Sequence, residues 1–506
     1  MYPEDHEMDK EDLIWKWICE KFVQHGKHQT SIFEVGETYF NELINRYMSI
    51  PIFNGFREVQ SCRVHDMVLD LIRSLSAESK FLKILESNKD ITSSQNNIRR
   101  LSLQNIEEDQ ETTLLANSMS ISQVRSITVF PLAMTIMPAI SSFGVLRVLD
   151  LHRCRIGALN SQPKVRDIGY LFHLRYLGLE RTGISEIPEE IGNLQFLQVL
   201  DLDCNFEMRV LPSSMWKLRQ LMSIKVLFRC YWPPGVLGNL TSLEVLETIY
   251  ASPSTAQELG NLARLRELDI HFLAWSLEVE ETFVETIFKL HDIQSLSITC
   301  DDVQYLDLLG GHWEPPRCLR KFAFSSDHIT CSSLPVWIMR SGPAQLSNLS
   351  KFDIIVKEVR QEDVQILERL PALIHLLVWS HQTERLLVIG SDEFCCVIAF
   401  GMHCEPATQL VFRQGALLNA ELVRFNLGVR VAIEDGNNDL FEIGLGNLLS
   451  LQSALVEIHW DGVTNMEAAK AYAAVKNAMN AQPRHPSIDI YMYPEKPEGT
   501  NYQNNT

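Results

Sequence analysis

The chain has 506 residues, a formal net charge of −19 and a hydrophobic content of 46%. The acidic balance argues against a dedicated nucleic-acid binder, whose surface needs a basic field to follow phosphates. The apolar content is that of a folded protein, and eleven cysteines without any C-x-x-C pair are typical of reduced thiols in a cytosolic protein.

The N-terminal stretch Met1–Glu7 is charged and has no apolar core, so we expect no signal peptide. Nowhere does the chain contain about 18 consecutive uncharged apolar residues, the minimum for a transmembrane helix. The sequence therefore predicts a protein without a membrane span.

Residues 1–90 have the pattern of a small α-rich domain of winged-helix type. Asp9 is placed to cap a helix that runs to about Val23, and a second helix is expected over about Val35–Met48. Glu58–Val64 is expected to form a short strand of a β-wing, and a third helix starts near His65. The apolar residues expected to be buried by the second and third helices are Tyr39, Phe40, Leu43, Tyr47, Val68, Leu71, Ile72 and Leu75.

Residues 91–493 are dominated by the pattern L-x-x-L-x-L, which is clearest over Leu174–Leu179 and Leu197–Leu202. The two copies start 197 − 174 = 23 residues apart, a spacing typical of leucine-rich repeats. The first, fourth and sixth side chains should point inward, and stacked units should bury them in a curved solenoid with a concave sheet. Further copies start at 98, 124, 146, 221, 243, 265, 293, 319, 349, 373, 422 and 455, and the register is uncertain over 390–415.

The end of the repeat array needs a cap, because its last apolar face has no following repeat. An Ala-rich helix over about Asn465–Met479, followed by a strand over Ser487–Tyr491, is expected to supply it. Residues 494–506 are rich in Pro, Glu, Gly and Asn and are expected to form a disordered tail. The predicted fold is thus an α/β leucine-rich-repeat solenoid (horseshoe) preceded by a small α-rich winged-helix domain.

Outward-facing positions of the predicted strands are the candidate protein-binding residues. They are acidic early in the array, whereas basic and aromatic side chains appear later, and exposed aromatic side chains often anchor protein recognition. Contacts to the chain's own N-terminal domain are the competing interpretation. The candidates are Tyr176, Asp201, Asp203, Glu267, Asp269, His375 and Trp379.

Two stretches hint at metal binding without matching a known pattern. Asp435–Asp439 has Leu440 and Gly446 where a calcium-binding EF-hand loop needs Gly and Glu. Cys395, Cys396, His403 and Cys404 are close in sequence, but adjacent cysteines in a strand point to opposite faces. We therefore expect a polar loop and core packing, respectively, and no metal site.

Four segments of the N-terminal domain closely resemble one family. They are Tyr2–Asp5, Asp12–Ile18, Gly36–Leu43 and Cys62–Leu71. This order is similar to the winged-helix part of the NB-ARC nucleotide-binding module in plant nucleotide-binding leucine-rich-repeat (NLR) disease-resistance proteins, of the coiled-coil type found in grasses. The resemblance continues through the repeats to the strand at Ser487–Tyr491.

The resemblance implies a fragment of a plant innate immune receptor, which acts in defence through protein recognition and autoinhibition by the repeats and is not an enzyme. Its partners would be a pathogen effector or a guarded host protein, together with a nucleotide-binding and coiled-coil module. The location would be cytoplasmic, with membrane association or nuclear entry on activation.

Val64-His65-Asp66 is similar to the family's Met-His-Asp motif, whose His contacts the phosphates of ADP. His65 and Asp66 are thus cofactor-binding candidates by resemblance only, because the chain contains no G-x-x-x-x-G-K-[ST] phosphate-binding loop. We expect no cofactor in this chain. An intact ADP/ATP-dependent switch with additional upstream sequence, and a non-immune adaptor scaffold, remain as alternative functions.

Overall fold

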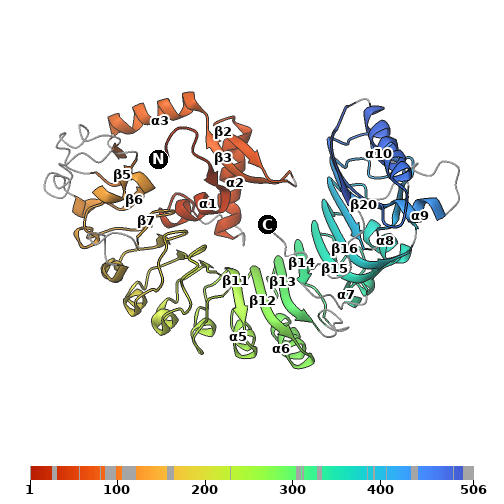
Figure 1. Cartoon of the computed structure of the whole chain (residues 1–506). Coiled ribbons are helices and arrows are strands. Elements are labelled where there is room, and N and C mark those ends of the chain that lie inside the picture. The colour runs from red at the N-terminus through yellow and green to blue at the C-terminus, as the bar shows by residue number, and fades with distance from the viewer. Residues whose placement is uncertain are drawn as a thin grey trace. The chain divides into compact units, whose positions relative to one another are not determined.

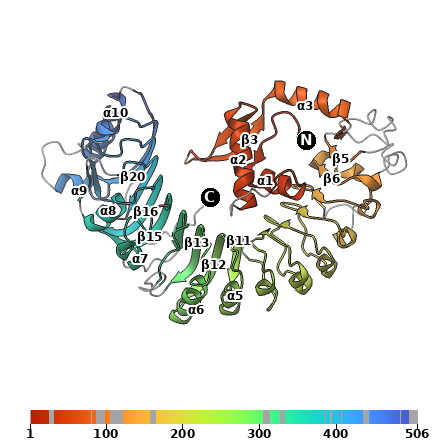
Figure 2. The same cartoon turned by 180° about the vertical axis from the view of Figure 1, so that it is seen from behind.

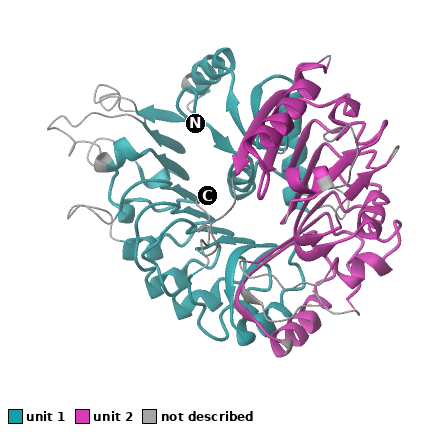
Figure 3. Ribbon diagram, turned by 45° about the vertical axis from the view of Figure 1, so that its right-hand side comes forward, with its two compact units in different colours: residues 1–271 teal, residues 272–506 magenta. Residues whose placement is uncertain are grey.

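The structure is a computed structural model, and Figures 1 and 2 show it from opposite sides. It divides into two compact units, Met1–His271 and Phe272–Thr506 (Figure 3). The described residues are 2–24, 31–55, 57–79, 81–85, 98–104, 121–156, 165–227, 229–303, 309, 313–326, 333–384, 386–390, 394–405, 407–434, 443–482 and 484–493.

The first unit opens with the expected winged-helix domain. Asp9 accepts hydrogen bonds from the backbone N–H groups of Glu11 and Asp12, as an N-cap should, and the first helix begins at the next residue. This helix ends four residues earlier than expected, and the chain turns at Lys21, whose φ is +65°. The elements are α1 (Lys10–Cys19), α2 (Ile32–Asn45), α3 (Asp66–Ser79) and a small antiparallel sheet ordered β1 (Met8–Asp9), β3 (Val59–Val64) and β2 (Ser49–Phe53).

The expectation that α3 buries an apolar face is wrong for most of its residues. Leu71 and Leu75 remain 56% and 53% exposed, whereas Leu69 is buried. Phe40 is likewise buried on α2, but Tyr47 beyond its end is exposed. The reason is that the domain packs onto the repeats through α1, which leaves one side of α3 uncovered by the described residues.

A parallel ladder of repeat strands follows in the same unit. The pairing of its strands agrees with the predicted pattern, because Leu149, Leu177 and Leu200, each at the fourth position of its repeat, are register partners and fully buried. The ladder already begins at Lys83, inside the range 1–90. Its strands are β4 (Lys83–Leu85), β5 (Arg100–Leu103), β6 (Ser126–Val129), β7 (Val148–Asp150), β8 (Tyr176–Gly178), β9 (Val199–Asp201), β10 (Ser223–Lys225), β11 (Val245–Ala251) and β12 (Glu267–Trp275), of which Phe272–Trp275 belong to the second unit.

Short 3-10 turns form most of the returns between these strands, and α5 (Pro253–Leu259) forms one of the later ones. Asn205 closes one such return from a fully buried position. Its side-chain oxygen accepts from the backbone N–H groups of Thr182 and Gly183, and its nitrogen donates to the carbonyl of Leu202. Buried backbone groups need such partners, so one amide satisfies the turns of two neighbouring repeats.

The second unit continues the repeat architecture with longer strands and true helices. Its parallel ladder is β13 (Ser295–Val303), β14 (Lys321–Ser326), β15 (Lys351–Val359), β16 (His375–Thr383), β18 (Ala399–Cys404), β20 (Leu422–Gly428), β21 (Ser453–His459) and β22 (Ser487–Tyr493). A separate parallel pair joins β17 (Leu386–Ile389) to β19 (Gln409–Phe412). The helices are α6 (Leu277–Ile287), α7 (Val336–Arg340), α8 (Gln361–Glu368), α9 (Val429–Glu434) and α10 (Asn465–Asn480).

The predicted register fails at two late copies. Leu422 and Leu455 were expected to point inward, but both are only half-buried. In β21 the inward residues are instead Ala454 and Val456. Strands β18 and β19 (Gln409–Phe412) lie within the stretch 390–415, where the sequence left the register open.

A helix and a strand lie where the sequence predicts the C-terminal cap. Thr464 and Glu467 form a reciprocal capping box at the start of α10, which fixes the helix terminus. The helix buries Ala468, Ala471 and Val475, and β22 completes the ladder beside β21. No described helix is both long enough and apolar enough to span a lipid bilayer.

Candidate functional site

The concave face of the first unit presents side chains in parallel rows, and the winged-helix domain is docked on them. In Figures 1 and 2, α1 lies against the inner face of the early repeat strands. The innermost row is apolar: Val148, Tyr176 and Val199 are register partners and form one buried cluster with Ile14 and other α1 residues. The domain is therefore seated on the repeats through a hydrophobic core of its own.

The next row carries charge, in the order Asp150, Gly178, Asp201, Lys225 and Glu247. Lys16 of α1 reaches its first member, with Nζ 2.7 Å from the Asp150 carboxylate, and the two side chains are only 12% and 3% exposed. Burial alone would raise the pKa of Asp150, but the positive charges of Lys16 and His152 hold that pKa well below its usual range. The pair is thus a buried ion pair.

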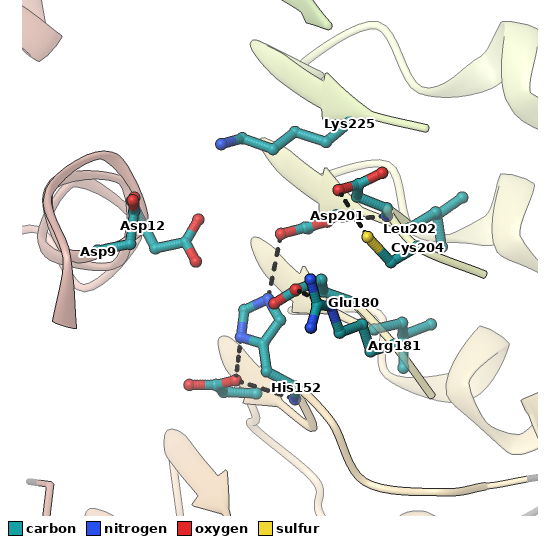
Figure 4. A network of polar contacts seen from close by, with 12 residues as sticks. Asp9, Asp12, His152, Glu180, Arg181, Asp201, Leu202, Cys204 and Lys225 are labelled. Carbon is teal, nitrogen blue, oxygen red and sulfur yellow. Dashed lines mark hydrogen bonds and ion pairs between the residues drawn. The ribbon is translucent and has the colours of Figure 1, made fainter. Parts of the chain in front are cut away.

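His152 links two carboxylates in this row. Its Nδ1 lies 2.6 Å from Asp150, and its Nε2 lies 3.1 Å from Asp201, two strands away (Figure 4). Burial would lower the pKa of His152, but the two carboxylates, Asp150 first, raise it to about 10. His152 is therefore a buried imidazolium at neutral pH.

The reach of His152 depends on Gly178, which stands between Asp150 and Asp201 in the row. A Cβ at Gly178 would lie 2.7 Å from the Cε1 atom of His152, too close for a real contact. The missing side chain leaves the space that the imidazole ring fills, so this glycine is required for a close approach.

Further ion pairs tie the domain to repeats on both sides of this centre. In each pair a basic residue of the repeats meets a Glu of the domain. The pairs are Arg100–Glu20 at 2.6 Å, Lys225–Glu11 at 3.2 Å and Arg266–Glu34 at 2.7 Å, and Figure 4 labels Lys225. The docking contacts thus run from Arg100 on β5 to Arg266, the residue before β12.

The structure places the acidic candidates of the first unit around this interface. Tyr176 and Asp201 face outward from the repeat core as expected, but the docked domain buries both. Asp203 is half-buried beside them, and its backbone N–H donates to Asp201. Glu267 and Asp269 are half-buried outward residues of β12. Much of the expected acidic surface is thus engaged within the chain.

The remaining candidates lie in the second unit or on the winged helix. His375 is buried at the start of β16, whereas Trp379 is 39% exposed and its ring lies 4.2 Å from that of His403. His65 and Asp66 are exposed at the start of α3, where the backbone N–H of Met67 points at His65 Nδ1 at a long 3.4 Å.

The stretches considered for metal binding divide in two. Asp435–Asp439 lies outside the described residues. Cys395 and Cys396 are exposed in a turn before β18, whereas Cys404 is buried in β18. His403 stands apart from the thiols, close to Glu457 and His459.

Sequence reasoning missed the residues at the centre of the interface: Lys16, Asp150, His152 and Gly178. One signal was available, because V-L-D occurs at the same repeat position at Asp150 and Asp201. A carboxylate that recurs on a concave row indicates cationic partners. Their identities could come only from the structure: Lys16 pairs with Asp150, and His152 is shared by Asp150 and Asp201.

Comparison with known proteins gives matches to both parts of the chain. Residues 123–488 match the family model described as leucine-rich repeat region, and residues 1–72 match the disease resistance protein winged helix domain. The chain is 28% identical over 418 residues to disease resistance protein Pik-2 of Oryza sativa subsp. japonica, and 27% identical over 500 residues to disease resistance protein RGA5 of the same organism.

These alignments cover 74% and 96% of the chain but only 39% and 43% of the two relatives, so the chain spans less than half of their length. Among solved structures, the crystal structure of PEPR1-AtPEP1 aligns with 80% of this chain. The alignment covers 63% of the matched chain of that structure, at 13% sequence identity and a TM-score of 0.36.

Proposed function

We propose a role in plant immunity for this chain, which belongs to the leucine-rich-repeat family and corresponds to the C-terminal, winged-helix and repeat portion of an NLR-type disease resistance protein. In this proposal the early repeats restrain the winged-helix domain, and the later repeats recognise a protein. The role is that of a receptor rather than an enzyme.

The buried Lys16–Asp150 pair is the observation that carries the restraint. A buried ion pair adds little net stability over apolar packing, but breaking it by removing one partner is strongly destabilising. The docked state is therefore held by groups that a modest movement of α1 would expose together. Such a contact is suited to a two-state switch, in which a ligand shifts the balance between docked and released domain.

A charge reversal tests this restraint. Lys16→Glu should place a carboxylate beside Asp150 and release α1. Lys16→Glu combined with Asp150→Lys should restore part of the docking, because the pair is re-formed with its charges exchanged while His152 loses its Asp150 partner. Expressed in plant leaves, the single variant should raise hypersensitive cell death and the double variant should return it toward the natural level.

The matched control is Lys10→Glu, because Lys10 is on α1 like Lys16 but forms its 2.7 Å pair inside the domain, with Glu37 of α2. Hydrogen exchange of α1 separates the possible failures. Faster exchange in Lys16→Glu without a change in cell death would refute the restraint, because α1 would then be released without activating the protein.

For recognition, we propose that the concave face of the second unit binds a pathogen effector or a guarded host protein. The support is Trp379 of β16, which is 39% exposed, together with Lys321 and Lys351, which are register partners on the two preceding strands. An amphipathic, partly exposed Trp fits the common anchors of protein interfaces.

Truncation of the aromatic ring tests this surface. Trp379→Ala should weaken capture of the recognised protein at least about tenfold, as expected for an anchor residue. Leu386→Ala is the control, since Leu386 is 40% exposed but belongs to the separate β17–β19 pair. Equal effects of the two changes would contradict the assignment.

His65 and Asp66 would face bound ADP only in the presence of a phosphate-binding module, which their motif implies by resemblance. We propose that this chain alone binds ADP weakly or not at all, because its sequence lacks the phosphate-binding loop. Isothermal titration with micromolar or tighter ADP affinity would favour the competing function, a nucleotide-driven switch within the chain.

A further inference from the structure

Three potential metal ligands converge on the outward face of the second unit. His403 comes from β18, and Glu457 and His459 come from β21, so all three belong to one compact unit. One ligand atom from each lies within 4.8 Å of the other two. The Nδ1 atom of His403 is 3.5 Å and the Nε2 atom of His459 is 3.9 Å from the same oxygen, Oε2 of Glu457.

The strand between them makes this convergence possible. Asn426 of β20 stands in register between His403 and Glu457, and a long side chain there would separate them. Its amide is instead committed to the backbone of β18, where it accepts from the N–H of Cys404 and donates to that residue's carbonyl. The His and Glu side chains therefore meet above Asn426 across two strand spacings of about 4.8 Å each.

We propose that His403, Glu457 and His459 form a binding site for a divalent first-row transition metal, with Zn²⁺ as its representative. Imidazole nitrogen favours such ions over Ca²⁺ and Mg²⁺, which prefer oxygen ligands. Zn²⁺ bonds nitrogen and oxygen ligands at about 2.0–2.2 Å, which in tetrahedral geometry separates the ligand atoms by about 3.3–3.6 Å. The present contacts need to tighten by less than about 1.5 Å to reach that geometry.

The surroundings of the histidines support a metal-binding orientation. Glu405 lies 3.7 Å from Nε2 of His403, on the side away from Glu457, and ligating histidines usually direct their second ring nitrogen to a carboxylate. Aromatic contacts also hold the rings: His403 packs on Trp379 in a tilted arrangement, and His459 stacks on Tyr493. The Nε2 atom of His459 is buried and has no hydrogen-bond partner among the described residues, and its nearest carboxylate oxygen, on Glu457, is 3.9 Å away.

A second cluster of similar composition, Asp12, His152 and Asp201 in the first unit, does not share this character. Both ring nitrogens of His152 are already engaged by Asp150 and Asp201, and Lys16 supplies positive charge next to Asp150. A metal ion there would have to displace existing charge-assisted contacts. At His403 the carboxylate contacts are longer, at 3.5 and 3.7 Å, and leave room for an ion.

Zinc titration of the full chain tests the site. The natural chain and a Cys395→Ser/Cys396→Ser variant, which removes the two exposed neighbouring thiols, should both bind one Zn²⁺ with micromolar affinity by isothermal titration. In that variant, His403→Ala and His459→Ala should each weaken binding by at least about tenfold. His173→Ala is the matched control, because His173 is exposed in the first unit, and it should leave the affinity unchanged.

Two further variants keep the test independent of folding. Glu457→Gln preserves the shape of the side chain but removes its charge, and it should also weaken Zn²⁺ binding at least about tenfold. Co²⁺ should quench part of the tryptophan fluorescence, because Trp379 contacts His403 and Trp460 follows His459, and Trp379→Phe should reduce that quenching. Zn²⁺ affinity that is absent, or unaffected by the His403 and His459 changes, would overturn the proposal.

Discussion

Replacing Lys16 by Met is the most informative perturbation of the docked interface. At 2.7 Å the Lys16–Asp150 attraction is about 6 kcal/mol for an effective dielectric of about 20, and desolvation of both charges offsets much of it. Removing one partner of such a buried pair typically costs about 3–5 kcal/mol, because the remaining charge loses its compensation. His152 still lies 2.6 Å from Asp150, so we expect the lower end, about 3 kcal/mol.

Hydrogen exchange of the α1 amides, followed by mass spectrometry on the full chain, measures this loss. A cost of about 3 kcal/mol corresponds to exchange that is faster by more than about 100-fold. Lys10→Met is the control, since Lys10 forms a pair of equal length with Glu37 but both side chains are 25–31% exposed. An exposed pair contributes at most about 1 kcal/mol, so exchange should change by less than about tenfold.

Similar exchange rates in the two variants would refute the reasoning, because burial would then not decide the strength of the pair. A double-mutant cycle with Asp150→Asn makes the test quantitative. Contacting charged partners should show a coupling energy of about 0.5–3 kcal/mol. A coupling near zero would mean that Lys16 acts through its apolar stem rather than its charge.

Other predictions concern the repeats and the imidazolium at their surface. Leu200→Asp should lower the free energy of unfolding in urea by several kcal/mol, because a carboxylate enters the strand core. Asp201→Asn should lower it by about 1–3 kcal/mol, since the His152 contact is buried. Equal losses for the two variants would contradict the register. Because the pKa of His152 is raised to about 10, its contribution to stability is complete below about pH 6.5 and is lost between about pH 6.5 and 10. This loss of stability with rising pH should be absent in His152→Asn. Gly178→Ala should destabilise by about 1–3 kcal/mol in thermal melts by displacing the ring, whereas Gly342→Ala, at an open position, should change stability by less than about 1 kcal/mol.

The repeat architecture could be predicted from sequence because its cause is local. Each strand must bury its first, fourth and sixth side chains, so the spacing of Leu174, Leu177 and Leu179 predicts that these three point into the core. The prediction failed where apolar residues occupy successive positions. In β21 both Leu455 and Val456 could be the inward residue, and the strand pairing with β20 selects Val456.

The docked interface could not be predicted in the same way, because its partners are far apart in sequence. Asp201 was expected to face solvent, and it does point outward from the repeat core, yet it is only 4% exposed. An amphipathic pattern tells which side of a strand faces away from its own core. It does not tell whether another part of the chain, here α1 about 190 residues earlier, lies on that side.

The charge order along the concave row also determines how α1 docks. Lys16 meets Asp150 on β7, whereas Glu11, at the other end of the helix, meets Lys225 on β10. A reversed helix would bring Lys16 toward Lys225 and Glu11 toward Asp150, so two attractive pairs would become two repulsive ones. The apolar row beneath would accept either direction, since hydrophobic burial is non-directional. The ion pairs therefore specify the orientation of the domain, even though each of them adds little net stability over apolar contacts.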